Sequence, residues 1–180
     1  MGGQFKTYGP FSISYELGDV DEQQIADWFE QEVGKKHPGL PEAVGVYIIC
    51  DKSAASKLIP WYVGKTYKGF LKRFRQHSQL KRCFGGSRKD WADKKAAIFL
   101  LALSSGKQEF RKPVTGKNKV LAIDAIEDML IQDCLKLNSN LLNTSQKTLY
   151  RSLSVPGYVG PRKNGSDDSA KSLRQLFANV

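Results

Sequence analysis

Hydrophobic and polar positions alternate near the start of the chain and then take helical spacing. The segment FSISY at 11–15 alternates apolar and serine residues, which predicts a short strand or hairpin within residues 1–20. Apolar residues then recur at helical spacing up to Val33, after aspartates that suit a helix cap, and Gly34 is a natural stop. The next segment, KKHPGLPE, is typical of a linker.

Three later segments have the composition of β-strands. GVYIIC at 45–50 and IPWYVGKT at 59–66 are apolar, aromatic and β-branched, and a hairpin that joins them is the simplest interpretation. AAIFLLAL at 96–103 is a continuous apolar run of strand length. Such a run predicts a central strand that is buried on both faces.

Two helices are predicted around this third strand. KGFLKRFRQH at 68–77 places its apolar residues on one side and basic residues around the rest, as a short amphipathic helix does. The segment 120–137 has the clearest helical pattern in the chain. Its predicted apolar stripe consists of Ile123, Ile126, Leu130, Cys134 and Leu137. Beyond Tyr150 the pattern is weak, and SAKSLRQLF is the candidate for a terminal helix.

The net charge of the chain predicts what kind of partner it binds. The 180 residues are 41% hydrophobic, which suits one compact domain, and 28 Lys and Arg against 18 Asp and Glu leave a net charge of +10. This excess attracts polyanions, so nucleic acid is the expected partner; a basic protein without catalytic activity, such as a ribosomal or chromatin component, would have the same charge. Two basic loops, 78–90 and 104–119, are candidate contacts to a nucleic-acid backbone. Their predicted binding residues are Lys81, Arg82, Arg88, Lys89, Lys107, Arg111 and Lys112.

The cysteines favour neither a zinc site nor a disulfide framework. Cys50, Cys83 and Cys134 are odd in number and widely spaced, and only His37 and His77 could join them. The first residues lack the pattern of a secretory signal, and no apolar run is long enough to span a bilayer. We therefore expect a cytoplasmic protein, and a nuclear or organellar location stays open.

The candidates for chemistry are ordinary when each is taken alone. Tyr47 and Tyr62 occupy strand segments, in which aromatic residues usually pack. Arg73 and His77 share one helix face, where a solvated basic surface is the simpler interpretation. Glu127 could simply complement the dipole of its helix. Only their order and spacing together indicate a function.

That order resembles the GIY-YIG nuclease superfamily over roughly residues 43–145. The resemblance rests on GVY at 45–47, YVG at 62–64 followed by Lys65 and Thr66, the Arg73-xxx-His77 helix, EDMLI from Glu127 onward, and an Asn-rich end. Val replaces Ile in both tripeptides, a mild change of volume within a strand. The family asparagine has two candidates, Asn140 and Asn143, and Asn143 is preferred because LLN resembles the usual apolar approach to that residue.

For the fold, the resemblance implies the α+β class, with a small three-stranded antiparallel sheet flanked by helices. Residues 1–42 would form an N-terminal extension with one helix, residues 43–148 the nuclease-like domain, and residues 149–180 a basic tail with a short helix. The connector between Tyr47 and Tyr62 is rather long for the family, and the loop 104–119 also looks extended. Contacts to substrate are therefore expected to differ from those of relatives.

For the activity, the resemblance implies Mg²⁺-dependent hydrolysis of phosphodiester bonds, with Mn²⁺ as the alternative ion. Tyr47 would receive the proton of the attacking water, and Lys65 or His77 would help to move or hold that proton. Tyr62 would orient the water or the phosphate.

Charge compensation falls to the remaining members of the motif. Arg73 would stabilise the pentacoordinate transition state with its planar set of donors. Glu127 would bind the metal together with substrate oxygens and water. Asn143 or Asn140 would hold nearby backbone or the scissile phosphate by neutral hydrogen bonds.

The expected substrate is DNA, double-stranded in the first instance, with RNA as an open alternative. A restriction-type or phage-defence endonuclease is the first interpretation. The oligomeric state stays open, and a dimer is one way in which both strands could be cut. A repair or branched-structure nuclease that acts with a partner is the second interpretation. The third is a nucleic-acid-binding domain that kept the fold without the activity.

Overall fold

The computed structural model describes residues 4–14, 22–52, 57–76, 95–104, 110–113 and 120–143. The chain divides into two compact units, Met1–Leu142 and Asn143–Val180, and the fold below is that of the first unit. Its elements are, in chain order, β1 (Gln4–Ser14), α1 (Glu22–Trp28), the π-helical segment η1 (Phe29–Gly34), β2 (Gly45–Lys52), β3 (Leu58–Thr66), α2 (Phe70–Arg75), β4 (Lys95–Ser104) and α4 (Leu121–Leu137).

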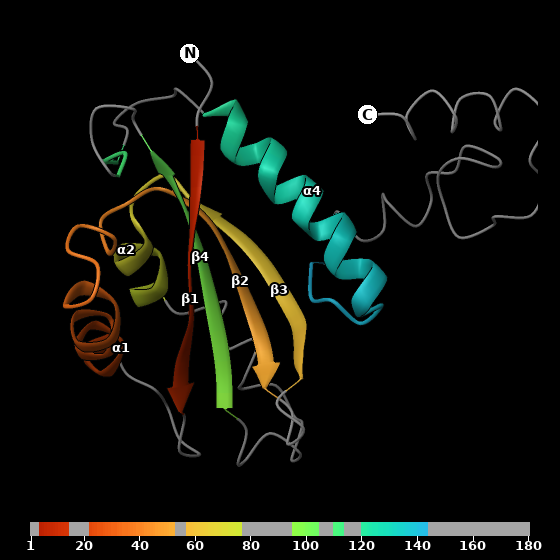
Figure 1. The fold of residues 1–180 in the computed structure, drawn as a ribbon, viewed down its shortest axis with the longest axis horizontal. Helices are drawn as coiled ribbons and strands as arrows, with labels where there is room; N and C mark the ends of the chain where they lie inside the picture. The colour runs from red at the N-terminus through yellow and green to blue at the C-terminus, as the bar shows by residue number, and fades with distance from the viewer. Residues whose placement is uncertain are drawn as a thin grey trace, which may run out of the picture. The chain divides into compact units, whose positions relative to one another are not determined.

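The described strands form one antiparallel sheet in the order β1-β4-β2-β3 (Figure 1). The α+β class, the β2–β3 hairpin and the central place of β4 are as the sequence predicts. The sheet has one strand more than the predicted three, because β1 pairs with β4 from Gln4 opposite Ser104 to Ser14 opposite Lys95. The region expected as an N-terminal extension thus contributes an edge strand to the sheet.

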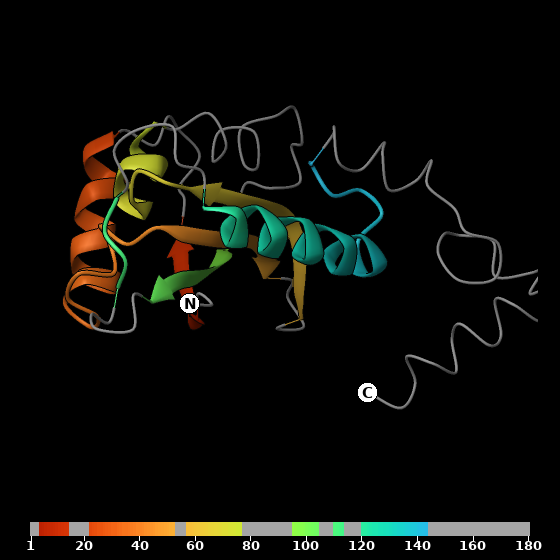
Figure 2. The same ribbon diagram turned by 90° about the horizontal axis from the view of Figure 1, so that it is seen from above.

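One face of the sheet carries α1, η1 and α2, and α1 and α2 lie side by side (Figure 1, Figure 2). Buried phenylalanines hold these segments to the strands: Phe29 and Phe74 pack at a ring distance of 5.1 Å within the core cluster that includes Tyr47. The predicted helix does end at Gly34, although its last turns take π-helical hydrogen bonds. The predicted short amphipathic helix is α2, which buries Phe70 and Phe74.

The other helix, α4, packs on β3 and β2. Its buried residues are Ile123, Glu127, Ile131 and Cys134. The predicted stripe is wrong at its far end, since Leu137 is 75% exposed, and Ile126 and Leu130 are only half-buried. The predicted stripe did not include Glu127, whereas the structure buries this residue on the side of α4 that faces Lys65 of β3. The physical cause is an ion pair across the interface, described below.

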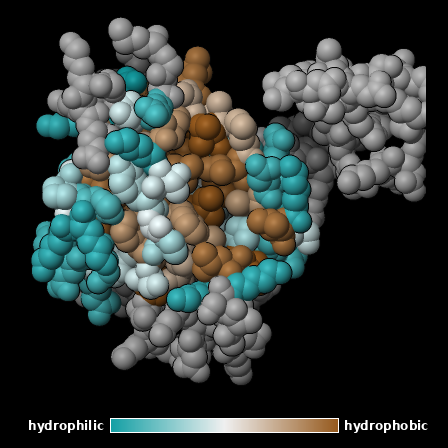
Figure 3. Space-filling model, viewed as in Figure 1, coloured by the Kyte–Doolittle hydropathy of each residue, from teal (hydrophilic) through white to brown (hydrophobic). Residues whose placement is uncertain are grey.

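Figure 3 shows apolar residues along the middle of the sheet and hydrophilic residues of α4 beside them. The register places Ile48, Phe99 and Leu101 on the same face as α4, and each is half-buried. The stretch 96–103 is therefore less completely covered than its apolar run predicts. Within the described residues, no helix has the length and apolar character needed to cross a membrane.

Candidate active site

Tyr47, Tyr62 and Arg73 form one cluster, here called the phenol–guanidinium cluster. Tyr47 is buried in β2, and its ring lies 4.8 Å from that of Phe74 and 6.1 Å from that of Tyr62. The Arg73 Nε–H donates to the Tyr47 hydroxyl oxygen at 3.3 Å. This hydrogen bond joins two residues, Tyr47 and Arg73, that lie 26 positions apart in the sequence.

The turn after β3 sets the start of α2 and so the place of Arg73. The Thr66 hydroxyl donates to the carbonyl of Gly69 at 3.0 Å and accepts the N–H of Lys68 at 3.1 Å. Gly69 has φ +96°, a conformation that favours glycine, and its carbonyl accepts the Arg73 N–H at 3.1 Å. Thr66, the second residue after YVG, therefore has a local structural task, which is to hold the turn at which the helix that carries the arginine begins.

Both glycines of the GVY and YVG tripeptides are required by close packing. A Cβ atom at Gly64 would lie 2.5 Å from the hydroxyl oxygen of Tyr47, because the tyrosine ring crosses β3 at this point. A Cβ atom at Gly45 would collide with the carbonyl of Leu101 on β4. The tripeptides thus owe their glycines to the placement of Tyr47 and to the approach of β2 and β4.

The charge of Arg73 is secured by its neighbours. Partial burial works to lower the pKa of Arg73, but the interactions with Tyr47 and Tyr62 together outweigh it, so the pKa is raised. The guanidinium is positive at any working pH. A fixed positive charge beside the Tyr47 oxygen favours negative charge developing on that atom.

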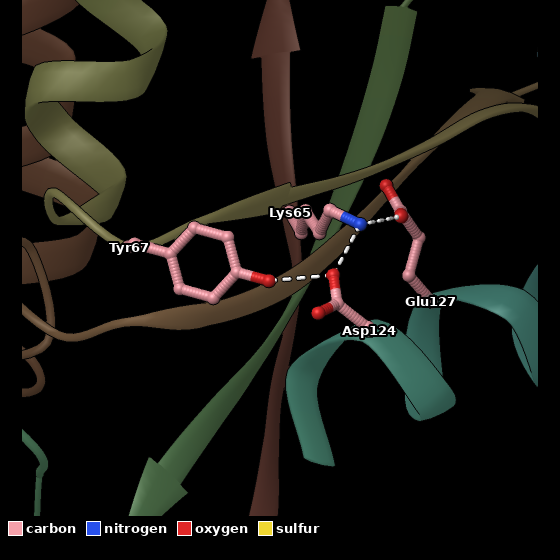
Figure 4. A network of polar contacts seen from close by, with 4 residues as sticks. All are labelled: Lys65, Tyr67, Asp124 and Glu127. Atoms are coloured by element: carbon pink, nitrogen blue, oxygen red, sulfur yellow. Dashed lines mark hydrogen bonds and ion pairs between the residues drawn. The ribbon is translucent and has the colours of Figure 1, made fainter. Parts of the chain in front are cut away.

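Lys65, Tyr67, Asp124 and Glu127 form a second cluster, here called the lysine–carboxylate cluster (Figure 4). Lys65 Nζ lies 2.5 Å from Asp124 Oδ1 and 2.7 Å from Glu127 Oε2. The Tyr67 hydroxyl donates to the same Asp124 oxygen at 2.5 Å. The cluster ties the end of β3 and the turn after it to the first turns of α4.

Burial dominates the electrostatics of Glu127. Desolvation raises its pKa, and the pairing with Lys65 opposes this without cancelling it. Partial burial works to lower the pKa of Lys65, but the contacts with Asp124 and Glu127 raise it overall. Burial and the bond to Asp124 raise the pKa of Tyr67 to about 12, so this phenol is protonated at neutral pH.

The two clusters flank the same point of β3 from opposite faces of the sheet. Val46 pairs with Lys65, whereas Tyr47 pairs with Gly64. Side chains of neighbouring residues in a strand point to opposite faces, so Lys65 lies on the α4 face and Tyr47 on the α2 face. The Tyr47 ring nevertheless crosses Gly64, the residue adjacent to Lys65. In the described sheet β3 is an edge strand, so both clusters lie beside Gly64 and Lys65 at that edge.

The donor set suits a metal that is held in part by substrate. No group of three or more His, Cys, Asp or Glu side chains gathers around one point in the described residues. Glu127 and Asp124, one helical turn apart, are the carboxylates at hand, and Glu127 is only 5% exposed. Mg²⁺ is commonly bound by one or two carboxylates with water and phosphate oxygens completing its shell. The residues present fit such an open site.

Comparisons with protein-family models, with curated proteins and with solved structures find no match. The resemblance stated from the motifs therefore stays a prediction. The geometry of the two clusters is the physical basis on which a function can be argued.

The remaining predicted residues are distributed unevenly. His77, Lys81, Arg82, Arg88, Lys89 and Lys107 lie outside the described residues. Arg111 and Lys112 are exposed, and the backbone of Arg111 is held firmly: its N–H donates to Leu103 at 2.7 Å and its carbonyl accepts from Val44 at 3.1 Å. Asn140 is exposed, whereas Asn143, the first residue of the second unit, is buried.

Two members of the lysine–carboxylate cluster were not predicted. Asp124 precedes Glu127 by three positions, which places both carboxylates on one helix face, and this spacing was a usable signal. Tyr67 directly follows the YVGKT motif but carries no pattern of its own. Its role depends on a contact with Asp124, 57 residues away, that periodicity does not reveal.

Proposed function

We propose that this chain is a metal-dependent endonuclease of the GIY-YIG type that hydrolyses DNA phosphodiester bonds. The observation that carries the proposal is the contact between the Arg73 guanidinium and the Tyr47 hydroxyl beside Gly64 of an edge strand. A fixed positive charge next to a phenol favours the phenolate form, and a phenolate can accept a proton. The same guanidinium has further N–H groups to offer to a phosphate.

The chemistry needs a base, a donor for the phosphoryl oxygens and compensation of charge on the leaving oxygen. In the proposed step a water oxygen bonds to phosphorus while its proton passes to the Tyr47 oxygen, in the phenolate form that Arg73 favours. The bond from phosphorus to the leaving sugar oxygen breaks, and that oxygen takes a proton from solvent. Arg73 stabilises the negative charge on the phosphoryl oxygens, and Tyr62 orients the water or the phosphate.

Glu127 is the residue proposed to hold the metal, with Asp124 beside it. When bound, a hard divalent cation supplies charge compensation for the phosphate and the departing oxygen. A phosphate at the edge of β3 could approach groups from both faces of the sheet, because no further described strand lies beyond β3. The net charge of +10 favours a polyanionic substrate.

The proposal is tested with the full chain, Mg²⁺, supercoiled plasmid and branched DNA oligonucleotides, with an RNA duplex as a third substrate. Wild type should produce nicked or linear plasmid in Mg²⁺ and none in excess chelator. Glu127→Gln should abolish cleavage and keep DNA affinity within a few fold, since the basic surface is unchanged. Sequencing of the ends separates a sequence-specific enzyme from a structure-selective one.

Two outcomes would overturn the proposal. Cleavage by Glu127→Gln at the wild-type rate would show that the assigned site does not carry the reaction. Tight DNA binding with no cleavage of any of the three substrates would instead assign the chain to the class of silent nucleic-acid-binding domains.

A further inference from the structure

We propose that Lys65 is a built-in counter-ion of Glu127, and that Asp124 retains the Lys65 ammonium when a divalent cation takes its place at Glu127. The inference rests on the proposed function, since a metal at Glu127 is part of it. It assigns to Lys65 and Asp124 a positioning role in metal exchange. Neither residue is thereby a catalytic residue.

The geometry places one ammonium between two carboxylates of unequal burial. The side chain of Glu127 is 7% exposed, whereas those of Lys65 and Asp124 are 32% and 27% exposed. Glu127 belongs to the buried residues of α4, so its side chain is more confined than that of Lys65. Lys65 has a flexible, partly exposed stem, so it is the partner that can move.

A cation at Oε2 of Glu127 and the Lys65 ammonium exclude one another. The ammonium lies 2.7 Å from Glu127 Oε2, and that oxygen is shielded from solvent. A Mg²⁺ ion would need to approach such an oxygen to about 2.0–2.1 Å, within the space that the ammonium fills. Two positive charges at one oxygen would also repel each other.

Asp124 provides the site to which the ammonium can withdraw. Its Oδ1 already contacts Lys65 Nζ, so the ammonium can break its ion pair with Glu127 and still keep a charged partner. The Tyr67 hydroxyl donates to this same oxygen and holds the carboxylate toward Lys65. Without Asp124, release of Glu127 would leave the part-buried ammonium without a carboxylate partner among the described residues, which is costly.

A purely electrostatic role for Asp124 is separable from this positioning role. Asp128 also acts on Glu127 by charge, and its Coulomb effect on the pKa of Glu127 ranks above that of Asp124. Asp128 is exposed on the same helix. Asp128→Asn is therefore a matched control for the loss of one nearby negative charge.

The test measures Mn²⁺ binding to the full chain by electron paramagnetic resonance of the free ion, without nucleic acid. Lys65→Met removes the competing charge and should tighten Mn²⁺ binding about tenfold or more. Asp124→Asn should weaken binding several-fold more than Asp128→Asn does. In the Lys65→Met background this excess should vanish, leaving the two asparagine variants equal.

Circular dichroism melts check that each variant is folded. Should Lys65→Met not fold, Lys65→Gln keeps a hydrogen-bond donor without the charge and carries the same expectation.

Three results would overturn the inference. Unchanged Mn²⁺ affinity in both neutral Lys65 variants would show that the ammonium does not compete with the metal. Equal effects of Asp124→Asn and Asp128→Asn in the otherwise wild-type chain would reduce Asp124 to a distant charge. An Asp124→Asn excess that persists without Lys65 would make Asp124 a direct ligand. Wild-type Mn²⁺ affinity in Glu127→Gln would instead contradict the metal assignment in the proposed function.

Discussion

The ring of Tyr47 crosses the edge strand β3 at Gly64, with its hydroxyl oxygen 2.5 Å from the position that a Cβ atom of Gly64 would take. This relationship explains why a glycine stands in the middle of a strand, where it otherwise weakens the sheet. It also places the Tyr47 oxygen beside Gly64, which directly precedes Lys65 in β3. The hydroxyl held there by Arg73 is the feature on which the proposed reaction depends.

Gly64→Ala should therefore displace the Tyr47 ring. We expect a loss of about 1–3 kcal/mol in the free energy of unfolding, as for other overpacked sites, and a larger relative loss of cleavage. The matched control is Gly34→Ala, whose Cβ would lie 3.4 Å from the Phe29 carbonyl, a tolerable contact. Urea denaturation and plasmid cleavage of both variants measure the two effects. Equal stability of the two variants would contradict the close approach of Tyr47.

A second comparison separates Arg73 from a general basic surface. Arg73→Ala should lower the single-turnover rate by about 10²-fold or more, as does removal of one preorganised donor to an anionic transition state. Arg75→Ala, on the exposed side of the same helix, should change the rate by less than about threefold and act on DNA affinity instead. If both substitutions merely weaken binding alike, Arg73 has no role in the chemical step.

Local patterns were enough to predict most elements but not their partners. The hairpin β2–β3 and helix α2 follow from short apolar runs, and their glycines and aromatic residues are visible in the sequence. The pairing of β1 with β4 and the ion pair between Lys65 and Asp124, 59 residues apart, are non-local. Periodicity therefore missed Asp124 and Tyr67, whereas the order and spacing of the motifs singled out Glu127 and Arg73 as candidates.

We expect the ion pair between Lys65 and Glu127 to stabilise the fold less than a pair of apolar side chains would at the same positions. Lys65→Met leaves a buried carboxylate without its nearest positive charge, and we expect a loss of about 1–3 kcal/mol in the free energy of unfolding. In the double variant Lys65→Met/Glu127→Leu, apolar groups replace the pair, and stability should return to the wild-type value or exceed it by about 1 kcal/mol or more. Thermal and urea denaturation measure this, and a double variant less stable than Lys65→Met would refute it.

Alkaline pH should destabilise the fold through its buried thiols. Burial raises the pKa of Cys50 to about 12 and that of Cys134 to about 11. Unfolded thiols ionise near about 8.5, so above this pH the unfolded chain releases protons that the folded chain keeps. Stability should fall as pH rises from about 8.5 toward 11. Urea midpoints of wild type and Cys50→Ala between pH 7 and 10 test this, and the variant should show the shallower decline.

If the chain binds nucleic acid as proposed, Arg111 and Lys112 offer a test of whether it reads bases or only follows the backbone. Blocks of Lys and Arg on glycine-containing loops favour backbone contacts, because base readout usually needs a rigid mount. The structure gives Arg111 such a mount, since its backbone bonds to both Val44 and Leu103. Its neighbour Lys112 is exposed beside it and provides the matched comparison.

We therefore expect Arg111→Gln and Lys112→Gln to differ in kind. Arg111→Gln should cost about 1–3 kcal/mol at one base position and relax the preference there, as loss of a bidentate guanine contact does. Lys112→Gln should weaken all DNA sequences alike and flatten the salt dependence of binding by about one unit of slope. Binding-site selection and salt titration on both variants measure these effects. A uniform loss in both would place Arg111 among the backbone contacts, because releasing counterions weakens every sequence equally, whereas losing a base contact changes only the position it reads.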